Sequence, residues 1–380
     1  MIGISVSLYD KFDDLSIAHD IIRHNWEDEY YISVCSNHPD ASERINELDL
    51  EIDSFQRGAQ IPFEDKMEDR HKRTNFLLRV NDTIRTAIKN AFTEDAVDYV
   101  LHLHSDAWPL SEQSLKDLIR DMDNRNADVA FKVDTRKFLN NYPPGHIMDQ
   151  FMIFNVKSCS SNNLFERSIL DFPPGIHSHR LIMMECIVTL GWDSLYHYSN
   201  RTEETFWDGK PIPSTGRIVR PMVYNPSFDQ LHVATEDFPN NLGKSLQSHY
   251  LKEYGLTDGN YIKELINNHS ASATDLFHNL DVFYNELDRE LKWYYGLSTE
   301  SMGRETPKIK LYTDLPRLEK TKKIVRHNVD NMLRGSYNRV KNMLGGANPN
   351  SSIEAGSADL LLHNYYEDIL NTEELPDDIS

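Results

Sequence analysis

The first 125 residues alternate short apolar segments with longer amphipathic ones, and this alternation constrains the fold more than any other feature. Apolar segments typical of strands cover residues 2–8, 30–35 and 50–55, and a fourth runs from 99 to Pro109. Segments with helical spacing of apolar residues follow them, at residues 14–25, 41–48 and 67–92 and in a helix that opens at 111–113. A strand–helix alternation with apolar strands is typical of a mostly parallel sheet with helices on both faces. The sequence therefore predicts an α/β fold for the N-terminal half.

Composition narrows the class of protein further. A chain of 380 residues with 39% hydrophobic residues can bury a full core. No apolar run is as long as a membrane span, and no charged segment precedes the first strand, so neither a transmembrane helix nor a signal peptide is expected. The net charge of −20 argues against nucleic acid as a partner.

The three cysteines, Cys35, Cys159 and Cys186, are scattered and odd in number. They lack the spacing of a metal site, so we expect reduced thiols that pack in the core. Thiols of this kind are typical of a reducing compartment, which predicts a cytoplasmic protein.

The predicted organisation has three parts. Residues 1–237 form the α/β domain, residues 238–345 a helical extension, and residues 346–380 an acidic and mobile tail. The extension contains eleven Lys and Arg residues but only four Asp and Glu residues between positions 304 and 341. An amphipathic helix over 316–344 would either lie on an anionic membrane surface or pack on the domain with its basic face in water.

The fourth apolar segment ends in a cluster of potential ligands. A two-residue alternation places His102, His104 and Asp106 on one side of this strand, with Leu101 and Leu103 on the other. Open α/β folds bind ligands at the carboxyl ends of their strands, so this position predicts a binding site. The alternative is structural: the aspartate would cap a turn or helix, and the histidines would be satisfied core groups.

The order of these motifs resembles that of GT-A-fold, nucleotide-sugar-dependent glycosyltransferases, close to the family 2-like enzymes. The likeness covers roughly residues 1–235, and its motifs are Ser7-Leu8-Tyr9-Asp10, Ser36-Asn37-His38, Arg57-Gly58, Arg73-Thr74-Asn75, Arg79-Val80-Asn81-Asp82 and His104-Ser105-Asp106. The last motif stands where the family has Asp-x-Asp, with histidine in place of the first aspartate. The resemblance implies a GT-A-like, Rossmann-like sheet flanked by helices, followed by the helical extension.

The resemblance also implies the substrates. The donor would be a nucleoside diphosphate sugar, and the acceptor a glycan, a lipid-linked molecule or a protein. Eight residues match the positions that contact the nucleotide sugar: Ser7, Tyr9, Asp10, Asn37, Arg57, Asn81, His104 and Ser105. Arg57 and Arg73 carry the guanidinium groups that would steady a diphosphate.

A divalent cation is the cofactor that the resemblance implies, because it would neutralise the departing diphosphate. Asp106 is the first predicted ligand, His232 the second and His104 the third. Mg²⁺ prefers oxygen ligands and Mn²⁺ tolerates imidazole, so either ion suits this set. The alternative for His232 is an ordinary histidine at a strand edge.

A glycosyl transfer with inversion needs a base that takes the proton of the acceptor. The family places it near a helix that ends at a glycine, here the apolar segment before Gly191. Glu185 stands in the middle of this segment and is the first candidate, with Asp149 and His179 in reserve. In the alternative, Glu185 pairs with Arg180 or faces solvent.

Two other functions remain open from the sequence. A nucleotidyltransferase-like enzyme on a similar sheet would be expected to carry a glycine-rich phosphate loop, whereas Gly3 and Gly58 stand alone. A non-catalytic relic that binds sugar nucleotides would have kept the fold and lost one carboxylate of the Asp-x-Asp motif.

Overall fold

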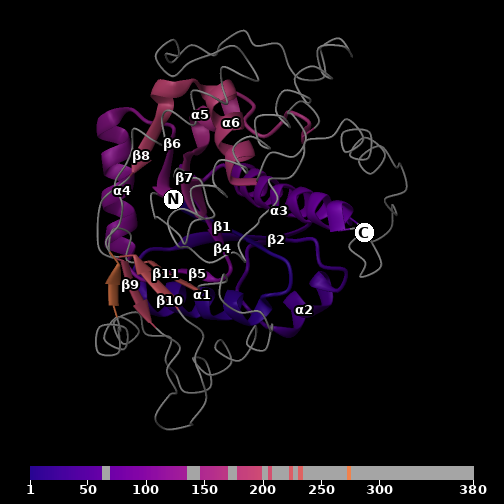
Figure 1. The fold of residues 1–380 in the computed structure, drawn as a ribbon. Coiled ribbons are helices and arrows are strands. Elements are labelled where there is room, and N and C mark those ends of the chain that lie inside the picture. Colours follow the sequence, from indigo (N-terminus) through magenta and orange to yellow (C-terminus); the bar gives the residue numbers. More distant parts are fainter. Residues whose placement is uncertain are drawn as a thin grey trace, which may run out of the picture.

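The computed structural model describes residues 1–61, 69–134, 146–169 and 178–198, and four short strands at 204–207, 222–225, 230–233 and 272–274. Within these ranges the main element is a sheet of seven strands, in the order β3-β2-β1-β4-β7-β6-β8 (Figure 1). The strands are β1 (Ile2–Leu8), β2 (Tyr30–Ser36), β3 (Ser54–Arg57), β4 (Tyr99–His104), β6 (Val129–Asp134), β7 (His146–Asn155) and β8 (Leu195–Tyr198). Only β7 runs antiparallel to its neighbours in this sheet. The predicted α/β class with a mostly parallel sheet is confirmed.

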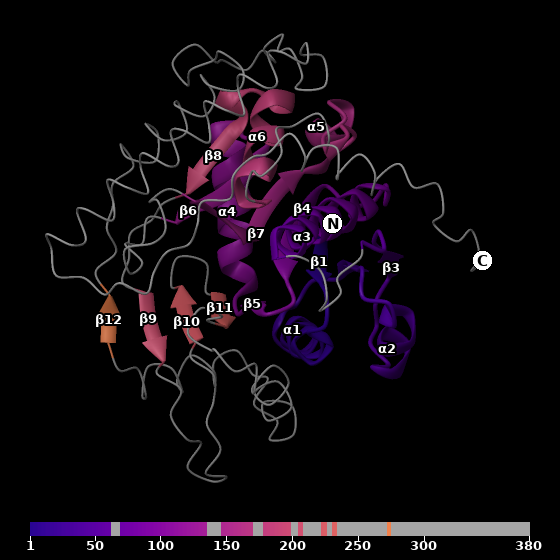
Figure 2. The same cartoon turned by 45° about the vertical axis from the view of Figure 1, so that its right-hand side comes forward.

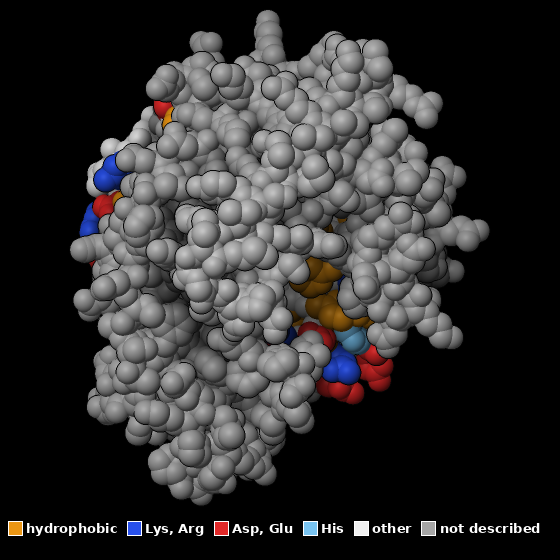
Figure 3. Space-filling view, viewed as in Figure 1, with side chains coloured by type: hydrophobic (Ala, Val, Ile, Leu, Met, Phe, Trp, Pro, Cys, Tyr) orange, Lys and Arg blue, Asp and Glu red, His pale blue; other side chains and the backbone are white. Residues whose placement is uncertain are grey.

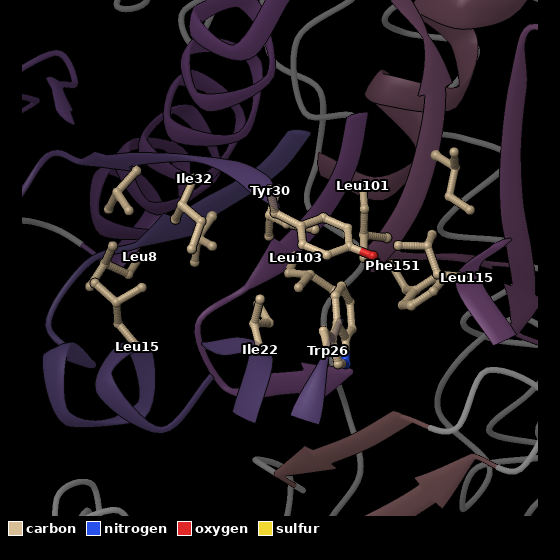
Figure 4. Packing of buried hydrophobic residues seen from close by; sticks show 14 of the residues in the cluster. Leu8, Leu15, Ile22, Trp26, Tyr30, Ile32, Leu101, Leu103, Leu115 and Phe151 are labelled. Atoms are coloured by element: carbon tan, nitrogen blue, oxygen red, sulfur yellow. The ribbon is translucent and has the colours of Figure 1, made fainter. Parts of the chain in front are cut away.

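Helices cover both faces of this sheet. They are α1 (Phe12–Asn25), α2 (Ala41–Glu47), α3 (Asp69–Phe92), α4 (Glu112–Arg125), α5 (Val156–Ser161) and α6 (Ser178–Leu190), with a short 3-10 helix η2 (Trp192–Ser194) before β8. Apolar residues of α1, α2 and α4 form one core with the sheet, and those of α3, α5 and α6 form another. Figure 4 shows the first core, where Leu15 and Ile22 of α1 lie below Leu103 of β4. The molecule is therefore a three-layer α/β structure.

The structure confirms some predicted element ends and moves others. β1 has the predicted bounds, and α4 begins after Ser111, whose hydroxyl accepts a hydrogen bond from the Ser114 amide at 3.2 Å. The third strand begins at Ser54 rather than at Leu50. Residues 50–53 instead form a turn, in which the Asp53 carboxylate accepts a hydrogen bond from the Ile32 amide at 2.7 Å.

A second sheet continues from the end of β4. The strands β5 (Ala107–Pro109), β9 (Glu204–Trp207), β10 (Met222–Asn225), β11 (Gln230–Val233) and β12 (Ser272–Thr274) pair antiparallel in the order β12-β9-β10-β11-β5. Figure 2 shows them side by side, with β5 close to α1. The strand predicted to run from 99 to Pro109 is thus two strands, because Ser105 and Asp106 form a turn between them.

The predicted helical extension is described only at the short strand β12, so its helical character stays a prediction. The predicted basic helix over 316–344 and the acidic tail over 346–380 lie outside the described residues. The boundary near residue 237 therefore stays a prediction.

Two predictions about the chain as a whole can be compared with the structure. Cys35, Cys159 and Cys186 are buried free thiols, as predicted. In the part of the chain that the structure describes, no helix combines the length and the apolar character needed to cross a membrane.

Candidate functional site

The turns that follow β1, β2, β3 and β4 meet at one edge of the main sheet, which we call the carboxyl edge. Two backbone hydrogen bonds join them: the Ser105 amide donates to the Ser7 carbonyl at 3.2 Å, and the Gly58 amide donates to the Ser36 carbonyl at 2.9 Å. β7 is antiparallel to β4 and brings its amino-terminal half, with Asp149, to the same edge. Ligand sites of α/β sheets form at such an edge, and most of the predicted site residues lie there.

The predicted metal ligand Asp106 lies in the turn between β4 and β5. Its side chain is only 5% exposed, and its carboxylate is paired with the ammonium of Lys11, the residue before α1. The sequence predicts one regular strand with His102, His104 and Asp106 on the same side. The strand ends at His104 instead, so Asp106 is not part of it. The turn releases Asp106 from the two-residue alternation and brings it to Lys11.

Trp108 holds this turn in place. Its indole is fully buried, and its Nε1–H group points to two carbonyl oxygens, that of Ser105 at 3.0 Å and that of Asp14 at 3.2 Å. The tryptophan thereby ties the turn that carries Asp106 to the first turn of α1, where Lys11 lies. Neither Lys11 nor Trp108 is among the site residues predicted from the sequence, although Lys11 follows Asp10 and Trp108 lies two residues after Asp106.

An aromatic surface lies beside this pair, on the turn between β1 and α1. The Tyr9 ring is 37% exposed, and the guanidinium carbon of Arg79 lies 3.5 Å from its centroid. The His38 ring contacts the same tyrosine, with 5.0 Å between centroids. Burial lowers the pKa of His38, so its imidazole is neutral at pH 7. An exposed ring supported from below by a cation is suited to stacking against a flat, polar ring.

Buried hydrogen bonds fix the position of Arg79 under that ring. The Asn37 amide donates to the Arg79 carbonyl at 3.1 Å, and Asn37 is 3% exposed. Next to it, the Asp82 carboxylate accepts a hydrogen bond from the Ala59 amide at 2.7 Å. A Cβ atom at Gly58 would lie 2.9 Å from the Asp82 Oδ2 atom and 3.1 Å from the Asn37 Cβ atom, so a larger residue here would displace the Asp82 carboxylate from its place beside Ala59.

Three hydrophilic side chains lie close together on β4 and β7, those of His102, His104 and Asp149. His102 is fully buried, with its Nδ1 atom 2.9 Å from the Ser5 hydroxyl and its Nε2 atom 3.4 Å from that of Ser7. Burial holds its pKa well below the ordinary value, so it is neutral and acts as a satisfied core histidine. His104 reaches solvent, with 26% of its side chain exposed, and its Nε2 atom lies 3.9 Å from an oxygen of the buried Asp149.

Glu185 lies away from this cluster, between α6 and α3. Its side chain is 1% exposed and accepts a hydrogen bond from Arg85 of α3 at 3.1 Å. Arg85 also donates to the backbone carbonyls of Phe165 and Arg167. Burial raises the pKa of Glu185 to about 7, against the opposing effect of the arginine. The described partner of Glu185 is thus Arg85, while the side chain of Arg180, its partner in the alternative from the sequence, is not among those described.

Several predicted nucleotide contacts are engaged within the protein. Asn81 donates to the Leu77 carbonyl of its own helix at 3.0 Å, and Ser105 is 2% exposed. Arg57 is exposed and donates to the Pro39 carbonyl at 3.1 Å. Asp10 is exposed and follows Tyr9 on the same turn. Asp10, Arg57 and Ser105 lie at the carboxyl edge and Asn81 within α3, and their contacts with a nucleotide stay predictions.

The structure brings His232 to the predicted metal site through its backbone. β11 pairs with β5, and His232 lies opposite Ala107, the residue after Asp106. Its side chain is not among those described, and neither are those of His179, in the first turn of α6, and Arg73 of α3. Among the described side chains, no three His, Cys, Asp or Glu residues could hold a metal ion. With Lys11 on Asp106, these side chains alone do not fit a divalent cation.

Side chains of several kinds are exposed near the carboxyl end of β2. In Figure 3, apolar, histidine, basic and acidic side chains gather at the lower right, over the place of α2 in Figure 1.

The opposite edge of the sheet, which we call the amino edge, holds a hollow of about 1130 Å³. Five carboxylates line it, those of Asp28, Glu29, Glu94, Asp95 and Asp98, and they outnumber its two cationic groups, Lys157 and the Met1 amino group, which is paired with Asp98 at 2.6 Å.

Comparisons with known proteins give no family for this chain. No protein-family model matches the sequence, and no curated protein matches it. Solved structures do match, among them mouse xyloside xylosyltransferase 1, with 11% identity, a TM-score of 0.31, and coverage of 52% of this chain and 85% of that one.

Two further solved structures are similar to parts of the chain. S. aureus TarS has 11% identity and a TM-score of 0.30, over 53% of this chain and 35% of that one. The 4-diphosphocytidyl-2C-methyl-D-erythritol synthase of Anaerococcus prevotii has 10% identity and a TM-score of 0.27, over 43% and 73%. These values are too low to support a function, and the fold class rests on the strand order described above.

Proposed function

We propose that this protein is a glycosyltransferase that binds a nucleoside diphosphate sugar at the carboxyl edge and transfers the sugar to an acceptor hydroxyl. The observation that carries the proposal is the turn between β1 and α1. It presents the exposed Tyr9 ring over Arg79 and, two residues later, Lys11 on Asp106. One short segment thus carries both an aromatic surface for the nucleobase and a cation for the phosphates. The order of sequence motifs, which resembles that of GT-A-fold glycosyltransferases, supports the same reading.

The nucleobase would stack on Tyr9. Stacking of a base on an aromatic side chain contributes about 1–3 kcal/mol and suits any base. The guanidinium of Arg79 occupies the other side of the ring, so the base would approach from the exposed side. His38 and Asp10 border this surface and supply polar groups that could select among bases.

The diphosphate would lie toward Lys11. Five carboxylates line the hollow at the amino edge, and they would repel an anion. At the carboxyl edge, two side chains carry positive charge. Lys11 lies just before α1, and Arg79 of α3 lies under the Tyr9 ring. The charge arrangement therefore favours the carboxyl edge for a nucleoside diphosphate, although the hollow lies at the other edge.

The proton of the acceptor would pass to the pair formed by His104 and Asp149. In the transfer, the acceptor oxygen forms a bond to the anomeric carbon, and the bond from that carbon to the diphosphate oxygen breaks. The diphosphate leaves with the electron pair, and the acceptor proton moves to the partly exposed imidazole of His104. The buried carboxylate of Asp149, 3.9 Å away, would stabilise the imidazolium that results. Glu185 is paired with Arg85 inside the helix layer, so we assign it second place as a base.

The experiment is a binding and turnover assay with the whole chain. Isothermal titration calorimetry with UDP, GDP, CDP, ADP and dTDP should find at least one diphosphate with micromolar affinity. Sugar release from the matching nucleotide sugar should follow, and both should be unchanged in Asp95→Asn, which alters the amino edge. If no diphosphate binds at millimolar concentration, the proposal is wrong.

The same assay separates the two alternative functions. A diphosphate that binds while none of its sugar conjugates is cleaved or transferred would indicate the non-catalytic relic. Release of pyrophosphate from a nucleoside triphosphate in the presence of a sugar phosphate would indicate a nucleotidyltransferase. Transfer to glycan or lipid-linked acceptors would identify the acceptor class.

A further inference from the structure

The Lys11–Asp106 pair occupies the position where a divalent cation is expected. Asp106 is the first predicted metal ligand, and its Oδ2 atom is in contact with the ammonium of Lys11. The carboxylate is 5% exposed and the lysine side chain 21%, so the carboxylate lies beneath the ammonium. A metal ion bound to Asp106 would compete with a cation that is already part of the protein.

The contact is held by the fold on both sides. The Leu15 amide of α1 donates to the Lys11 carbonyl at 3.2 Å, which fixes the backbone that carries the lysine. On the other side, the buried Trp108 binds the Ser105 carbonyl in the turn and the Asp14 carbonyl in α1. The two charged residues, 95 positions apart in the chain, are therefore brought together by buried contacts rather than by chance on the surface.

The ammonium has hydrogen-bonding capacity left for a ligand. It carries three N–H donors and no acceptor. Within the described part of the chain, Asp106 is the partner of Lys11, which leaves two donors and the exposed side of the ammonium. A carboxylate beneath an ammonium orients it, while a phosphate oxygen can bind from the solvent side.

We propose that the Lys11 ammonium, held by Asp106, takes the place of the divalent cation and neutralises the diphosphate, so that binding of the nucleotide needs no metal. This inference rests on the proposed function. Lys11 donates to a diphosphate oxygen, Asp106 positions Lys11, and the negative charge that develops on the leaving diphosphate is compensated by a group of this chain. The remaining predicted ligand with a described side chain, His104, faces Asp149.

The test compares nucleotide binding with and without metal. The Kd of UDP, GDP, CDP, ADP and dTDP is measured by calorimetry in EDTA and again in millimolar Mn²⁺ or Mg²⁺. The wild-type chain should bind its preferred diphosphate equally well in both conditions. Lys11→Met should weaken binding roughly tenfold or more in EDTA, and Lys11→Arg, which keeps the charge, should recover most of it. Lys157→Met, a lysine of the amino edge, is the matched control and should bind like wild type.

A second measurement detects the metal directly. Electron paramagnetic resonance of Mn²⁺ should show no high-affinity binding to the wild-type chain, with or without the diphosphate. Circular dichroism checks that each variant folds, and the wild-type comparison decides the question even if Lys11→Met does not fold.

The outcomes distinguish this inference from the proposed function. Binding that requires Mn²⁺ or Mg²⁺ and is lost in EDTA overturns the role of Lys11 and leaves the proposed function standing. Equal binding by Lys11→Met and wild type in EDTA also overturns it. Absence of diphosphate binding in every condition overturns both.

Discussion

The two edges of the main sheet carry different charged side chains. At the carboxyl edge, Lys11 lies on Asp106, and Arg79 lies under Tyr9. At the amino edge, five carboxylates and Lys157 line a hollow of about 1130 Å³. In the proposed function, the carboxylates of this hollow would repel a nucleotide, and the cations of the carboxyl edge would attract it. Charge and hydrogen-bonding capacity, rather than concavity, distinguish the two edges as binding sites.

Substitution of Asp149 should have the largest effect, and this effect should be confined to turnover. Asp149→Asn removes the charge that would stabilise a protonated His104, so sugar transfer or hydrolysis should fall by about 10²–10⁴-fold. The Kd of the diphosphate should stay unchanged, because Asp149 lies on β7 rather than on the turn with Tyr9. Asp95→Asn at the amino edge is the control. If Asp149→Asn turns over at the wild-type rate, another residue is the base, and Glu185→Gln is the next variant to measure.

The Arg85–Glu185 pair belongs to neither edge and should affect stability alone. Arg85→Met leaves a buried carboxylate and two backbone carbonyls without their donor, and should lower the free energy of unfolding by about 3 kcal/mol. Lys89→Met on the same helix breaks the exposed pair with Glu166 and should cost less than about 1 kcal/mol. Urea denaturation measures both. Equal losses in the two variants would show that burial does not distinguish these pairs.

The pH dependence of stability tests the same carboxyl group. Glu185 has a pKa of about 7 in the folded chain and near 4.5 when unfolded, so the folded state holds its proton more tightly. Its contribution to stability is complete below pH 4.5 and is lost as the pH rises through 7. The loss amounts to at most about 3–4 kcal/mol, since each pKa unit between 4.5 and about 7 corresponds to about 1.4 kcal/mol. Between pH 4 and 8, the free energy of unfolding of wild type should fall by this amount relative to that of Glu185→Gln. The same pH dependence in both chains would contradict the prediction.

Arg79 should have the smallest effect, and only on nucleotide affinity. Arg79→Met removes the cation beneath the Tyr9 ring, and a cation–π contact contributes about 0.5–2 kcal/mol. The Kd of the diphosphate should rise about tenfold in calorimetry. The matched substitution at the amino edge, Lys157→Met, should leave it unchanged. If the two variants bind equally well, the aromatic surface is not the nucleotide site.

The apolar pattern was sufficient to predict most of the elements. β1 has its predicted bounds, and Ser111 caps α4 as predicted, because these features depend on neighbouring residues. The strand around Leu50 was misplaced, since a turn and the Asp53 carboxylate compete with the strand there. Period-two alternation also failed at Asp106, where a two-residue turn interrupts the strand.

The site depended on contacts that no local pattern contains. The sequence by itself determined the α/β class, the burial of the three cysteines and the set of polar residues after the strands. Only the tertiary structure decided which of these residues meet: Lys11 with Asp106, Tyr9 with Arg79, and Glu185 with Arg85. Strand and helix propensities act between residues a few positions apart, whereas these partners are 70 to 100 positions apart and meet only when the sheet and its helices pack.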